Sequence, residues 1–232
     1  MSSLRAERTD DGFTLPELMV TIFLIGIIGS VLAGFVSMFS TTFTEERARL
    51  DSTNVAAIGM NEITRVVRAG IPIKNDYAAS GTGYDPAFVY AGAERLTLNA
   101  GLDTTSALLR PVRVTFALDS GRVLTETRIT PRAGGATEAQ WVFTGGGTTT
   151  SSRPIARTIL SSTGSEPSLF RYFAKDGESF VELVPPVGGS LSAADLVRIV
   201  RVEVYLKVQA DTTSRAEPVV LVNQVGIPNV GL

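Results

Sequence analysis

The stretch Gly12-Phe13-Thr14-Leu15-Pro16-Glu17 leads directly into a mostly apolar run over residues 18–39, and this pairing decides the fold of the N-terminal part. After Glu17, no charged residue appears until Glu45. About 20 apolar residues in a helix span the hydrocarbon core of a membrane, so the run is long enough to cross it. A lone carboxylate at the start of such a segment is costly in free energy if it enters the membrane. Glu17 is therefore a candidate functional residue that needs a partner of opposite charge.

The composition excludes several classes of chemistry. The chain has 232 residues, a net charge of −2, and neither cysteine nor histidine. Disulfides, histidine-based acid–base catalysis and the usual zinc ligands are therefore ruled out. We expect no metal, no cofactor and no small-molecule substrate. The slightly acidic charge also argues against nucleic acid as a partner.

The helix is predicted to continue beyond the apolar run. Over residues 44–69 the pattern is polar with an intermittent apolar face, which is typical of an amphipathic helix. Gly70 then supplies a C-terminal cap and Pro72 blocks further helix. We expect one helix over residues 14–69, with a membrane-spanning part over 13–43 and an amphipathic continuation over 44–70. The apolar positions of this continuation are Leu50, Ala57, Ile58, Ile63, Val66 and Val67.

After Pro72 the pattern changes to β-rich segments with alternating polarity. Tight turns at residues 119–121 and 175–177 predict hairpins. The Gly/Thr/Ser-rich residues 145–152 are expected to form a flexible loop. Arg198 and Arg201 are expected to face opposite sides of one strand. Residues 71–232 thus predict a mostly antiparallel sheet, and the whole chain an α+β fold with its long N-terminal helix packed on that sheet. The predicted strands cover residues 88–90, 96–98, 112–118, 123–129, 141–143, 169–173, 180–184, 197–208 and 219–225.

Residues 12–20 resemble the class III signal of type IV pilins and pseudopilins. The resemblance implies that residues 1–12 are a leader, which prepilin peptidase removes by cutting after Gly12. It also implies that Phe13 becomes an N-methylated N-terminus. Glu17 would then be the assembly carboxylate, which pairs with the terminal amine of a neighbouring subunit. Thr14, Leu15 and Pro16 complete the motif.

A looser resemblance to the larger minor pilins of the PilW type and to J-type pseudopilins involves residues 64–69, 169–173 and 197–223. It implies a minor subunit of a type IV pilus or secretion filament rather than an enzyme. Its partners would be prepilin peptidase, other pilin subunits and, before assembly, membrane lipid. The subunit would cross a bacterial cytoplasmic membrane once, with its β-rich domain over 71–232 outside the cytoplasm.

Three alternatives remain open from the sequence. The apolar run is also compatible with a plain single-pass anchor, in which case Gly12 is not cut. A tip adhesin or a DNA-capturing subunit of a competence pilus would share the same N-terminal signal. A membrane-anchored hydrolase is disfavoured because the chain lacks histidine, cysteine and any paired-acid motif.

Overall fold

The computed structural model describes residues 12, 14–76, 83–102, 110–135, 138–210 and 217–228. The chain divides into two compact units, Met1–Glu46 and Arg47–Leu232. Helix α1 (Leu15–Arg68) contributes to both units, and the remaining elements belong to the second. The predicted long N-terminal helix is therefore confirmed, and it begins and ends within one residue of the expected positions.

Local signals explain where α1 begins and ends. At its start, the carbonyl of Thr14 accepts a hydrogen bond from the backbone N–H of Leu18 at 3.1 Å. At its end, the N–H of Gly70 donates to the carbonyl of Val67 at 3.1 Å, which tightens the last turn. Pro72 follows two residues later and has no N–H with which to continue the ladder.

In the second unit, α1 buries a single face. Buried positions recur every three or four residues, the spacing that places side chains on one side of a helix. This face is closely packed, because a Cβ added to Gly59 would lie 3.1 Å from Cβ of Ala156 and 3.4 Å from Cδ2 of Leu206. The buried residues are Ser52, Ala56, Gly59, Met60, Ile63, Val66 and Val67.

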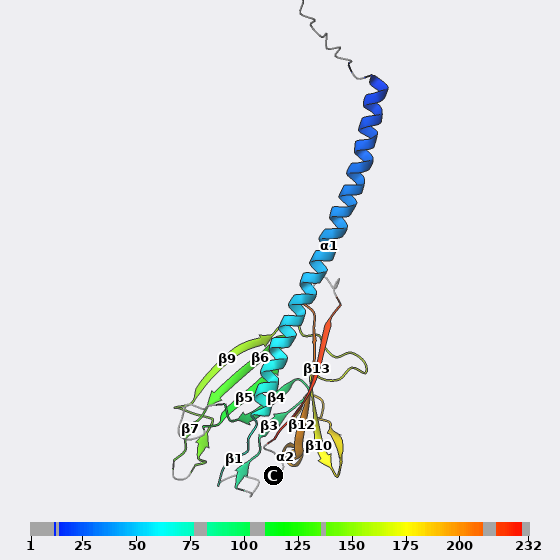
Figure 1. Cartoon of the computed structure of the whole chain (residues 1–232). Helices are drawn as coiled ribbons and strands as arrows, with labels where there is room; N and C mark the ends of the chain where they lie inside the picture. The colour runs from blue at the N-terminus through cyan, green and yellow to red at the C-terminus, as the bar shows by residue number, and fades with distance from the viewer. Residues whose placement is uncertain are drawn as a thin grey trace, which may run out of the picture. The chain divides into compact units, whose positions relative to one another are not determined.

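Two antiparallel sheets make up most of the second unit, and Figure 1 shows them beside the C-terminal part of α1. The five-stranded sheet has the order β3-β4-β5-β6-β9 and the four-stranded sheet the order β11-β10-β12-β13. The five strands are β3 (Phe88–Ala91), β4 (Arg95–Ala100), β5 (Val112–Leu118), β6 (Leu124–Thr130) and β9 (Thr149–Ala156). The four strands are β10 (Phe170–Asp176), β11 (Ser179–Leu183), β12 (Ile199–Val208) and β13 (Val219–Gly226). Two further pairs are β1 (Ile73–Lys74) with β2 (Tyr84–Asp85) and β7 (Arg132–Ala133) with β8 (Trp141–Val142).

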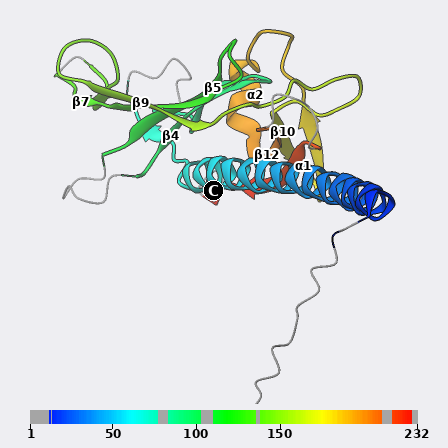
Figure 2. The same ribbon diagram turned by 90° about the horizontal axis from the view of Figure 1, so that it is seen from above.

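One continuous apolar core joins these layers. Ile63 and Val66 of α1, Phe116 of β5, and Tyr172 and Leu206 of the other sheet are all fully buried. Gly59 lies between β9 of one sheet and β12 of the other, and Figure 2 shows β4, β5 and β9 on the same side of α1. The predicted α+β class, with a long helix packed on antiparallel sheets, is confirmed.

Two local expectations are wrong. Residues 149–152 are not a flexible loop, because they form the first half of β9 and pair with β6. Arg198 is not in a strand but ends helix α2 (Ala193–Arg198), where Ser192 caps the N-terminus by accepting from the N–H of Asp195. In both places the local sequence pattern alone does not determine the secondary structure. Serine and threonine are tolerated in a solvent-exposed edge strand, and a capping serine starts a helical turn before β12.

Candidate functional site

The N-terminal signal lies at the start of α1, where its polar groups are exposed to solvent. Glu17 is in the first helical turn, and the hydroxyl of Thr14 donates to its Oε2 at 3.5 Å. No ion pair within the described part of the chain includes Glu17. Gly12 has no heavy atom within 4 Å of the position that a Cβ would take. Phe13, the expected methylation site, and the leader residues 1–11 lie outside the described residues.

Pro16 is compatible with the helix because of its position. It is the second residue of α1, where the backbone N–H of any residue would lack an intrahelical acceptor. Its fixed φ angle also suits a first turn. The motif residues Leu15 and Pro16 therefore begin the helix without breaking it, and Glu17 is held within the first turn.

The segment that follows the motif is helical and fully exposed. Every described residue from Thr14 to Glu46 is exposed, including Phe23 at 69% and Phe35 at 71%. By length and composition, α1 is a candidate membrane-spanning helix, with a mean hydropathy of 2.5 over its most apolar stretch. Apolar patches of this extent are rare on soluble monomers, so this surface needs lipid or other helices to cover it.

Residues 8–33 match the family model described as a prokaryotic N-terminal methylation motif. The motif indicates the type IV pilin and pseudopilin family. A search of the curated proteins gives no match to the chain. The motif implies processing by prepilin peptidase, and with the apolar helix it implies membrane anchoring before pilus assembly. The role of such a pilin-like protein is structural rather than enzymatic.

A second group of charged residues joins α1 of this pilin-like protein to the five-stranded sheet. Glu62 forms ion pairs with Arg65 at 2.6 Å, Arg128 at 2.7 Å and Arg153 at 3.0 Å. Glu126 of β6 has a fully buried side chain and pairs with Arg128 and Arg153, both at 2.7 Å. Each of the two carboxylates thus has at least two guanidinium partners, as a partly buried acid requires.

The electrostatics of this cluster favour charged Glu62. Burial by itself raises the pKa of Glu62, but the hydrogen bond and charge of Arg65 and the charge of Arg153 outweigh it. The pKa is lowered from 4.5 to about 2. Glu62 is therefore ionised at neutral pH, and the cluster acts as a polar connection between helix and sheet.

Local sequence patterns do not predict this cluster. The strand periodicity does predict that Glu126 is buried, because Glu126 lies two residues after Leu124 on β6 and both side chains therefore face the core. The partners Glu62 and Arg153 are far away in sequence, and only the packing of α1 beside β6 and β9 brings them together.

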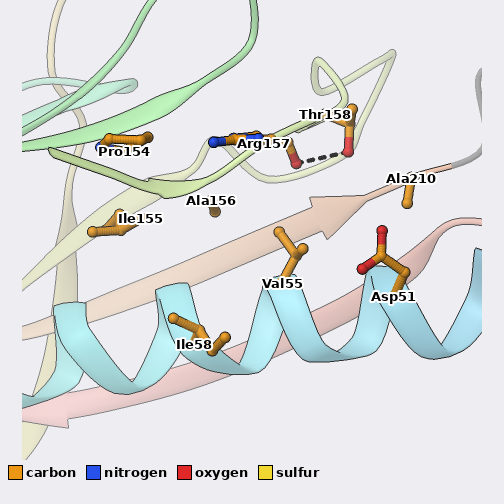
Figure 3. A pocket seen from close by; sticks show the side chains of 9 residues that line it. All are labelled: Asp51, Val55, Ile58, Pro154, Ile155, Ala156, Arg157, Thr158 and Ala210. Atoms are coloured by element: carbon orange, nitrogen blue, oxygen red, sulfur yellow. Dashed lines mark hydrogen bonds between the residues drawn. The ribbon is translucent and has the colours of Figure 1, made fainter.

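A small hollow lies between α1 and the end of β9 (Figure 3). Asp51 and Val55 project from the helix toward the 154–158 segment, and the hollow has a volume of about 300 Å³. Thr158 adopts a φ of +54° there, and its hydroxyl donates to the carbonyl of Arg157 at 2.7 Å. The lining contains one carboxylate, Asp51, and no second acid with which to form a catalytic pair. Its residues are Asp51, Val55, Ile58, Pro154, Ile155, Ala156, Arg157, Thr158 and Ala210.

Proposed function

We propose that this protein is a minor pilin or pseudopilin, a subunit of a type IV pilus or of a related secretion filament. The observation that carries the proposal is the methylation motif followed at once by the exposed apolar N-terminal part of α1. Prepilin peptidase cuts after Gly12 and the new N-terminus at Phe13 is methylated. The helix is stored in the membrane and then packs among the helices of other subunits.

Glu17 has a specific role in this assembly. A carboxylate carried into an apolar helix bundle is tolerated when a cation pairs with it. Cleavage after Gly12 creates a cationic amine at Phe13, and the amine of a neighbouring subunit is the proposed partner of Glu17. The absence of an ion pair at Glu17 within the described part of this single chain is compatible with a partner in another subunit.

The size and form of the second unit support a minor rather than a shaft subunit. Two sheets of five and four strands and several connecting loops make a large domain outside the membrane. Before assembly this domain would lie outside the cytoplasm of a bacterial cell, with α1 crossing the cytoplasmic membrane once. After assembly it would contact other pilin subunits at the filament surface.

The first test is the mass and N-terminal sequence of the protein extracted from the membrane of its native host. We expect a chain that starts at Phe13 and carries one added methyl group. An intact leader would instead support a plain single-pass anchor. Cleavage after the apolar run would mean a secreted protein and would contradict the proposal.

A further inference from the structure

Strand β11 forms an unprotected edge of the four-stranded sheet. Phe180 and Val181 are 43% and 45% exposed, although they lie on opposite faces of the strand. Val184, just beyond the strand, is 75% exposed. Within the described part of the chain, no backbone hydrogen bond joins β11 to any segment other than β10. Exposed apolar residues along an open edge favour pairing with another strand.

Each of the other three edges of the two large sheets has a local feature that limits the addition of another strand. Ser190 and Leu191 bond to the backbone of Ala91 and cover the end of β3. Strand β9 contains Pro154, which has no N–H to offer an added strand. Val220 and Val222 of β13 are also exposed, at 41% and 55%, but Asn223 of this strand donates its side-chain amide to Thr64 of α1 at 3.0 Å, which anchors part of β13 to the helix. None of these protections is present at β11.

The register of the hairpin shows which groups of β11 are available. Strands β10 and β11 are joined through Gly177, whose φ of +59° suits a tight turn, and Asp176 lies opposite Ser179. In an antiparallel pair, alternate residues exchange hydrogen bonds with the partner strand. Since Asp176 and Ser179 close the hairpin, the backbone groups of Phe180 and Glu182 point outward from the sheet.

A basic hollow of about 740 Å³ adjoins this edge. Arg68 from the end of α1, Lys175 of β10 and Arg201 of β12 line it, and the guanidinium of Arg201 lies 3.6 Å from the ring centre of Phe180. None of the three cations forms an ion pair with a described carboxylate. The hollow has no acidic residue in its lining, so it favours a ligand that supplies negative charge.

We propose that β11 and this hollow form a docking site for an extended, acidic segment of another polypeptide. The segment adds to the sheet as a fifth strand by bonding to the backbone of Phe180 and Glu182. Its apolar side chains cover Val181 on one face of the strand, and on the opposite face a carboxylate enters the hollow beside Phe180, Lys175 and Arg201. This mode of recognition obtains affinity from the main chain and specificity from the alternating side chains.

The site can be tested with the full chain in detergent micelles and a fluorescent synthetic peptide in which valine alternates with glutamate. Fluorescence anisotropy should show saturable binding. The same peptide with N-methyl groups on alternate backbone nitrogens should bind at least about tenfold more weakly, because strand pairing needs those N–H groups. Equal binding of both peptides would overturn the proposal.

Two variants test the two parts of the site. Glu182→Pro removes an outward N–H without removing a hydrogen bond to β10, and should weaken peptide binding about tenfold. Glu182→Thr, which also loses the carboxylate that pairs with Arg171, is the matched control and should bind normally. Lys175→Glu should shift the preference from the glutamate peptide to a lysine peptide. A labelled DNA duplex that displaces the peptide would overturn the proposal in favour of a nucleic-acid site.

Discussion

At the scale of single residues, Glu17 carries the strongest prediction, because it is the one charged residue between Asp11 and Glu45. Glu17→Val should leave membrane insertion intact, since the change makes the helix more apolar. Incorporation into filaments should fall to a small fraction of normal, because the neighbouring amine would lose its partner. The measurement compares the amount of protein in membranes and in sheared filaments.

Glu45→Val provides the matched control for that experiment. Glu45 is an exposed carboxylate on the same helix, beyond the apolar run. It should tolerate the substitution with filament incorporation near normal. Equal incorporation of the Glu17 and Glu45 variants would show that Glu17 has no special role in assembly.

Glu62 is the second residue for which a clear effect is expected. Its side chain is 16% exposed and pairs with three arginines, so Glu62→Gln should lower the free energy of unfolding by about 1–3 kcal/mol at pH 7. Chemical denaturation of the protein in detergent measures the change. Glu46→Gln, which alters an exposed carboxylate of α1, should have an effect near zero.

The Glu62 contribution should also depend on pH in a defined direction. Because folding lowers the pKa of Glu62 from 4.5 to about 2, its stabilising effect is complete above pH 4.5 and is lost as the pH falls toward 2. The difference in stability between the native protein and Glu62→Gln should therefore shrink across this range. A difference that stays constant from pH 7 to pH 2 would exclude Glu62 as its source.

At the scale of elements, the contact of α1 with the two sheets depends on Gly59. A Cβ at this position already lies 3.1 Å from Ala156, so the four-carbon side chain of Gly59→Leu has no space. We expect a loss of stability of about 1–3 kcal/mol, read from thermal or denaturant unfolding. Asn54→Leu places the same side chain on an exposed position of the helix and should change stability little. A Gly59→Leu variant as stable as the native protein would contradict the close packing.

At the scale of the whole molecule, the two units should behave differently in solution. The fragment 47–232 contains the entire buried core and lacks the exposed apolar stretch of α1. It should be monomeric without detergent in sedimentation velocity and should unfold in one cooperative transition. The full chain should require detergent or membrane. Aggregation of the fragment at low concentration would show that α1 residues before Arg47 are needed for its fold.

Much of the fold was accessible from local patterns, because helix and strand periodicities depend on nearby residues. The predicted strand over 112–118 coincides with β5, where the alternate residues Val112, Val114 and Phe116 are buried. Of the two-residue strands, β8 falls within the predicted strand over 141–143, whereas β1, β2 and β7 were missed, since so short a segment has no period to detect. Strand β9 was missed because serine and threonine are equally typical of a loop.

The sequence by itself determined the N-terminal signal, the apolar helix and the β-rich character of the rest. These properties reside in contiguous residues, and the motif is matched over residues 8–33. Only the tertiary structure decided that Glu62, Glu126, Arg128 and Arg153 form one cluster, and that β11 is the edge without protection. The physical reason is that ion pairs and sheet edges depend on which segments, distant in sequence, become neighbours in space. Local periodicity does not determine the order of the strands in a sheet.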